Sequence, residues 1–139
     1  MATTDLSESA KRVSEFAAAE VGVIAAYIFG SVALGRETAE SDIDIGILFA
    51  SDRIPDGLGR RDIGARLEET LGRDVDLIVL NDAKPIVVHQ ILRGLQAYCG
   101  EPRATARFIV RANAEYDDLK RVRRPIERAL LRGRVFDGR

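Results

Sequence analysis

The residues best suited to chemistry in this sequence are three aspartates that lie in or next to apolar segments. Asp42 and Asp44 are two residues apart at the start of a segment in which every second residue is apolar. In a β-strand, residues at this spacing point to the same face, with their side chains within about 7 Å of each other. Asp76 occupies a similar position in the next apolar segment, Asp74–Leu80. Carboxylates facing a core would be costly without compensation, whereas in a cleft they are ligands for hard divalent cations. If the two strands are neighbours, the three carboxylates form a candidate metal site.

A glycine–serine pair supplies the complementary part of such a site. Gly30 and Ser31 end the continuous apolar run Val21–Phe29, which has the composition of a buried strand. Glycine at a tight turn lets the backbone approach a ligand closely. Backbone N–H groups and a serine hydroxyl at that position can hold phosphate oxygens. A phosphate-binding turn facing three carboxylates is the arrangement that phosphoryl or nucleotidyl transfer needs.

The elements that must position these residues alternate between strands and helices. The spacing of apolar residues predicts helices over Asp5–Glu20, Leu58–Leu71 and Pro85 to about Arg93, strands over Val21–Phe29, Asp42–Phe49, Asp74–Leu80 and Leu95–Cys99, and a helical tail from about Arg103 to Leu131. This order predicts an α/β (α+β) fold, a small mixed sheet with helices packed against it. We expect one domain over residues 1–139, with its core at about residues 20–100.

Two residues give more specific expectations for helix ends, and one segment suggests a local turn. Gly72 should cap the C-terminus of the helix that precedes it. Pro125 should kink or break the helical tail, since proline removes a backbone hydrogen bond inside a helix. A helical turn is expected over Val32–Arg36.

The composition excludes several classes of protein. The chain has 139 residues, 46% of them hydrophobic and 31% charged, and its net charge is −1. This balance argues against wholesale electrostatic binding to nucleic acid or to an anionic membrane. The longest apolar run is about half of what a membrane span needs, and the N-terminus shows no targeting segment. We therefore expect a cytoplasmic protein. The basic C-terminal part predicts either a solvated helix face or a surface for an acidic partner protein or RNA, and the scarcity of aromatic residues there disfavours RNA.

The motif resembles that of a known superfamily. Gly30-Ser31, ten residues, then Asp42-Ile43-Asp44 is similar to the signature of the DNA polymerase beta-like nucleotidyltransferases. The preceding apolar strand and Asp76 match as well, so the resemblance covers roughly residues 24–98. The small size of the chain resembles the minimal nucleotidyltransferases, the MNT-type antitoxins encoded beside HEPN-domain toxins.

The resemblance implies a role for each motif residue. Gly30 and Ser31 would bind the β- and γ-phosphates of ATP, and Asp42 and Asp44 would hold two Mg²⁺ ions. Asp76 would join one metal ion and help to deprotonate the acceptor hydroxyl. In the MNT antitoxins that acceptor is a tyrosine of the HEPN toxin, a ribonuclease that AMPylation silences.

One residue departs from the family pattern. Leu34 stands where arginine is common, and Arg36 is the nearby cation that could contact a phosphate instead.

Three functions remain open at this point. The first is an antitoxin enzyme that transfers AMP to its toxin. The second is a non-catalytic antitoxin that binds and occludes the toxin, and the third is a small-molecule nucleotidyltransferase of the aminoglycoside type. Substitution of Asp42 and Asp44 by asparagine separates the first two, because only the enzyme would lose neutralising power. The third would need an acidic pocket, for which Glu101, Asp117 and Asp118 are the evident candidates. Assembly with itself or with a partner is compatible with all three.

Overall fold

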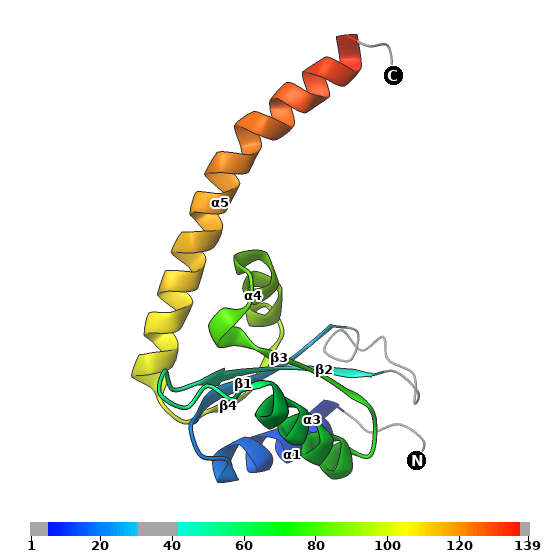
Figure 1. Cartoon of the computed structure of the whole chain (residues 1–139), viewed down its shortest axis with the longest axis vertical. Helices are drawn as coiled ribbons and strands as arrows, with labels where there is room; N and C mark the ends of the chain where they lie inside the picture. Colours follow the sequence, from blue (N-terminus) through cyan, green and yellow to red (C-terminus); the bar gives the residue numbers. More distant parts are fainter. Residues whose placement is uncertain (1–5, 31–41, 137–139) are drawn as a thin grey trace.

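The protein folds around a four-stranded mixed sheet with helices on both faces (Figure 1). The computed structural model describes residues 6–30 and 42–136, with side chains up to residue 121. Along the chain the elements are α1 (Leu6–Ala19), β1 (Val23–Phe29), β2 (Ile43–Phe49), α3 (Gly57–Leu71), β3 (Val75–Val79), the 3₁₀ turn η1 (Leu80–Asp82), α4 (Pro85–Leu92), β4 (Leu95–Cys99) and α5 (Pro102–Phe136). The predicted fold class is confirmed, and the predicted helical turn at residues 32–36 lies outside the described residues.

The strands lie in the order β3-β2-β1-β4. β1 pairs antiparallel with both β2 and β4, whereas β2 pairs parallel with β3. As a result, the end of β1 and the starts of the other three strands meet at one end of the sheet: Phe29 is opposite Asp44, Asp44 is opposite Asp76, and Ile28 is opposite Leu95. The residues singled out in the sequence lie at this end.

The alternation in β2 separates the two faces of the sheet, as predicted. Four of its five apolar residues, Ile43, Ile45, Ile47 and Phe49, are buried in one cluster with apolar residues of α1 and α3, and Leu48 is buried in the cluster on the opposite face. On the opposite face, Gly46 lies under α4 so closely that a Cβ atom there would come within 2.7 Å of Ile91 Cγ2. The missing side chain therefore lets α4 pack directly on the strand that carries Asp44.

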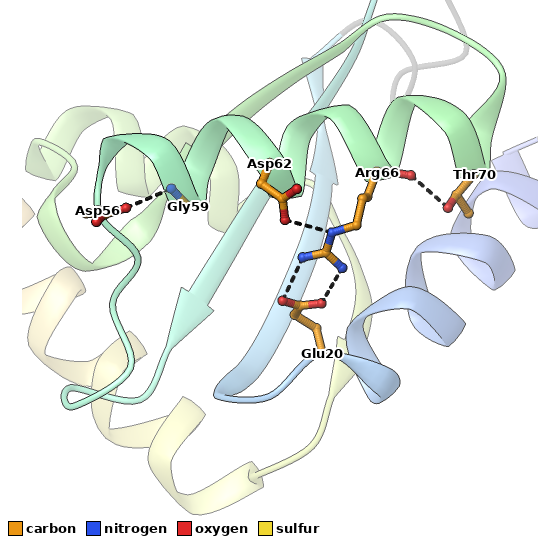
Figure 2. Close-up of polar contacts among 6 residues, drawn as sticks. All are labelled: Glu20, Asp56, Gly59, Asp62, Arg66 and Thr70. Carbon is orange, nitrogen blue, oxygen red and sulfur yellow. Dashed lines mark hydrogen bonds and ion pairs between the residues drawn. The ribbon is translucent and has the colours of Figure 1, made fainter.

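Local signals set both ends of α3. Asp56 caps α3, since its side chain accepts a hydrogen bond from the Gly59 backbone N–H at 2.7 Å (Figure 2). Gly72 ends the same helix in the left-handed conformation, with φ of 69°, which confirms the predicted C-cap.

The prediction of a break at Pro125 was wrong, because α5 continues through this residue to Phe136. Figure 1 shows α5 as one gently curved helix that extends well beyond the sheet. Proline removes only one backbone donor, and a curved helix can accommodate that loss. Of the helices described, none is both long and apolar enough to cross a membrane.

An arginine on α3 links this helix to the end of α1. Arg66 donates hydrogen bonds from its two terminal nitrogens to the Glu20 carboxylate, at 2.7 and 3.0 Å, and from Nε to Asp62 at 2.9 Å (Figure 2). The hydrogen bond to Glu20 is the main reason that the pKa of Arg66 is raised. The guanidinium also lies 5.3 Å from the centre of the Phe16 ring.

We expect Arg66→Ala to lower the free energy of unfolding by about 1 kcal/mol, the upper range for solvent-screened ion pairs with some lost packing. Chemical denaturation measures this value, and transferase activity should be unchanged. The control is Arg121→Ala, which removes a more exposed arginine from a 3.7 Å pair with Asp118. A loss no larger than that of Arg121→Ala would contradict a role for Arg66 in holding α1 and α3 together.

Candidate active site

Gly30 and Asp44 are packed against each other at the end of β1. Gly30 has φ of +75°, a conformation that glycine adopts readily and that residues with a Cβ atom rarely adopt. A Cβ atom on Gly30 would overlap the Asp44 carboxylate. Both requirements exclude a larger residue, so the Asp44 carboxylate can lie directly on the backbone of the turn.

A second carboxylate lies beside Asp44 on the neighbouring strand. Asp44 and Asp76 are directly paired in the parallel β2–β3 ladder, so their side chains share a face of the sheet. Asp44 is half-buried, whereas Asp42 and Asp76 are exposed. The pKa of Asp44 is raised, first by burial and then by the negative charges of Asp76 and Asp42. Among the described residues, the three acids thus form one electrostatic group without a compensating cation.

The acids do not form a ready-made cage for a metal ion. Within the described residues, no three His, Cys, Asp or Glu side chains converge as a complete set of protein ligands. Mg²⁺ in nucleotide sites is usually held by one or two carboxylates together with substrate phosphates and water. The donor set, carboxylate oxygens with mutually repelling charges, fits such an ion.

The structure places only part of the predicted phosphate-binding turn. Gly30 is described, and it adjoins Asp44. Ser31 and Arg36 lie outside the described residues, and their roles stay predictions.

A cavity of about 510 Å³ opens on the other flank of Gly30. The residues that line it come from the ends of four elements and the turn between α4 and β4: Leu6, Phe29, Gly30, Gln90, Arg93, Gly94 and Leu95. Sequence reasoning missed Gln90 and Arg93. The signal that could have found them is the pairing of β4 with β1, which brings the start of β4 beside the end of β1.

Comparison with known proteins identifies the fold and its chemistry. Residues 11–102 match the family described as polymerase beta, nucleotidyltransferase. The chain belongs to this nucleotidyltransferase family. The predicted superfamily and the predicted enzyme class are therefore confirmed.

Relatives within this nucleotidyltransferase family point to one branch. The chain is 31% identical over 100 residues to the protein adenylyltransferase MntA of Shewanella oneidensis, an alignment that covers 72% of this chain and 70% of the relative. A crystal structure of a toxin–antitoxin pair with AMP-PNP contains a chain with a TM-score of 0.74 and 26% identity, covering 88% of this chain and 98% of that one. A chain from a complex of a tri-AMPylated S. oneidensis HEPN toxin with an MNT antitoxin shares the fold, with a TM-score of 0.70 at 23% identity over 91% of this chain and 98% of that one. The predicted likeness to MNT-type antitoxins is confirmed.

Proposed function

We propose that this protein is a Mg²⁺-dependent adenylyltransferase that transfers AMP from ATP to a tyrosine hydroxyl of a HEPN-domain ribonuclease toxin and so neutralises it. The observation that carries the proposal is the in-register pair of Asp44 and Asp76 against the backbone of Gly30. Homology to a protein adenylyltransferase and similarity to a toxin–antitoxin structure with an ATP analogue support the nucleotide and the partner. The use of ATP supports a cytoplasmic location.

Each residue has a defined part in the reaction. Asp42 and Asp44, joined by Asp76, would hold two Mg²⁺ ions, which when bound offset the charge of the triphosphate and of the acids. Gly30 and Ser31 orient the β- and γ-phosphates through backbone N–H groups and a hydroxyl, and Arg36 adds a cation. Asp76 accepts the proton of the acceptor hydroxyl as its oxygen attacks the α-phosphorus. The bond from the α-phosphorus to pyrophosphate breaks, and pyrophosphate leaves with the electron pair.

The position of Asp76 supports a macromolecular acceptor. β3 is an edge strand of the sheet, next to the β2 strand that carries Asp44, and its residue Asp76 is exposed. A side chain on another protein can reach an exposed edge without a dedicated pocket. Among the described residues that line the cavity beside Gly30, none is acidic, which is unfavourable for a cationic small molecule such as an aminoglycoside.

Label transfer tests the proposal. The protein is incubated with Mg²⁺, ATP radiolabelled at the α-phosphate and the HEPN-domain protein of the neighbouring gene. We expect Asp76→Asn to reduce labelling of the toxin by about 10²- to 10⁴-fold, the range for loss of a general base. Asp74→Asn is the matched control, since Asp74 is an exposed aspartate only two residues away and should keep full activity.

The acceptor and the alternative mechanism are tested in the same experiment. Tyrosine-to-phenylalanine substitutions in the toxin should remove the label at the modified position. If wild-type protein and Asp76→Asn inhibit the ribonuclease equally and neither transfers label, the protein acts by occlusion and the proposal is wrong.

A further inference from the structure

The cavity beside Gly30 is built around the turn between α4 and β4. Its walls are the end of β1 (Phe29, Gly30), the last turn of α4 (Gln90), the connecting residues Arg93 and Gly94, and Leu95 at the start of β4, with Leu6 of α1 closing one side. It therefore adjoins the candidate active site through Gly30, a residue that contacts Asp44 on one side and the cavity on the other.

Gly94 fixes the position of this turn. A Cβ atom on Gly94 would lie 2.9 Å from Phe29 Cβ and 3.0 Å from Phe29 Cα, and it would overlap the carbonyl oxygen of Ile28. The Gly94 N–H donates a hydrogen bond to the Ile91 carbonyl at 2.9 Å. The turn is thus held on the two residues that precede Gly30, and Arg93 is held beside the phosphate-binding turn as a consequence.

The order of strands places the charged groups in a line. Across the end of the sheet, β3 carries Asp76, β2 carries Asp44, β1 ends just before Gly30, and β4 starts two residues after Arg93. Neighbouring strands are about 4.8 Å apart, so β4 lies about 10 Å from β2. With the α-phosphate at the acids and the acceptor at Asp76, as the proposed function requires, the β- and γ-phosphates would extend past Gly30 towards β4.

Among the described residues that line this cavity, Arg93 is the charged one, and its side chain is free to bind an anion. It is exposed, and among the described side chains it has no hydrogen-bond or ion-pair partner. Arg60 and Arg66, by contrast, are engaged with Asp82 and Glu20. A guanidinium binds phosphate with two parallel N–H donors, and the Gln90 amide supplies a further donor at the same wall.

We propose that this cavity holds the terminal phosphates of ATP and that Arg93 binds the pyrophosphate leaving group. The inference rests on the proposed function and adds a residue to it. As the acceptor oxygen bonds to the α-phosphorus, the bond to the bridging oxygen breaks and its electron pair passes to pyrophosphate. Arg93 stabilises the negative charge that develops there, while the proton of the acceptor goes to Asp76.

Binding measurements with three ligands test the inference. The probes are a non-hydrolysable ATP analogue, pyrophosphate and AMP, each titrated with Mg²⁺ by calorimetry or by competition. Arg93→Gln should weaken binding of the analogue and of pyrophosphate by about 10- to 100-fold, the range for loss of a charge-assisted hydrogen-bond pair. AMP, which lacks the terminal phosphates, should bind as tightly as before, and Arg93→Lys should recover part of the loss. The control is Arg61→Gln, which removes an exposed arginine of α3, a helix that packs on the face of the sheet opposite to α4.

Each other outcome has a distinct meaning. An equal loss for AMP and the analogue would mean that the apolar walls, Leu6, Phe29 and Leu95, hold the nucleobase, and the inference would be wrong. Unchanged binding of all three ligands would overturn it too. If the wild-type protein binds the ATP analogue and labels its toxin while Arg93→Gln behaves normally, only this inference fails. If the wild-type protein binds no nucleotide, the proposed function fails with it.

Discussion

Asp44→Asn should reduce nucleotidyl transfer by about a thousandfold or more and should also stabilise the nucleotide-free protein. The first effect follows from the proposed role of Asp44 as a charged oxygen ligand of Mg²⁺ at the reacting phosphate, where charge stabilisation contributes several kcal/mol. The gain in stability follows from the removal of a negative charge that, without a bound cation, is repelled by its acidic neighbours. Asp44 is half-buried beside Asp76 and Asp42, and burial followed by these two charges raises its pKa.

The sign of the stability effect follows from proton linkage. A carboxyl whose pKa is higher in the folded state binds its proton more tightly there than in the unfolded chain. Its contribution to stability is full at low pH and is lost as the pH rises through the folded-state pKa. At neutral pH the ionised Asp44 therefore destabilises the fold, and removal of its charge should raise the melting temperature by a few degrees. The difference should vanish in acid, where the wild-type carboxyl is protonated.

Thermal unfolding with and without Mg²⁺ and a non-hydrolysable ATP analogue measures both states. The ligand should stabilise wild-type protein much more than Asp44→Asn, so that the order of the two melting temperatures reverses on binding. The control is Asp42→Asn, which should lose activity but gain less stability because Asp42 is exposed. A lower melting temperature for nucleotide-free Asp44→Asn would show instead that the carboxylate supports the fold.

The parts of the structure that depend on local patterns could be predicted from the sequence. The alternation of apolar residues in β2 placed Asp44 on the face opposite Ile45. The C-cap at Gly72 follows from the local sequence alone. The proximity of Asp44 and Asp76 needed one assumption, that β2 and β3 are neighbours. Period-two alternation is strong evidence because a shift of one residue would expose every apolar side chain.

The parts that depend on strand order could not be predicted. β4 is a short strand of five residues, mostly exposed, and nothing in its composition shows that it pairs with β1. Without this pairing, nothing distinguishes Arg93 from the other arginines of the chain. The prediction of a break at Pro125 was also wrong, because the helix propensity of one residue does not decide the course of a 35-residue helix.

Gly30→Ala should reduce the rate of AMP transfer by about a hundredfold or more, although it adds only a single methyl group. The φ of +75° at Gly30 puts any L-residue under strain, and the new Cβ would overlap the Asp44 carboxylate. Either the turn or Asp44 must move, and a displacement of about 1 Å at reacting groups is enough for losses of this size. Initial rates of toxin labelling measure the effect.

Gly72 offers a matched control for the backbone strain alone. It has a similar φ of +69°, but apart from its neighbours in the chain no described residue has an atom within 4 Å of the position that its Cβ would take. Gly72→Ala should therefore lower the free energy of unfolding by about 1 kcal/mol and leave the rate of transfer unchanged. Equal losses of activity in Gly72→Ala and Gly30→Ala would mean that general destabilisation, and not the contact with Asp44, explains the result.

The double variant separates contact from strain still further. If Gly30→Ala acts by displacing the Asp44 carboxylate, this carboxylate no longer contributes in the variant, and adding Asp44→Asn should reduce the rate little beyond the loss in Asp44→Asn alone. Two independent losses would multiply. If the losses in rate of the two single variants multiply in the double variant, Gly30→Ala acts only on phosphate binding. If the double variant loses much less than that product, the turn and Asp44 act as one unit, as their direct packing requires.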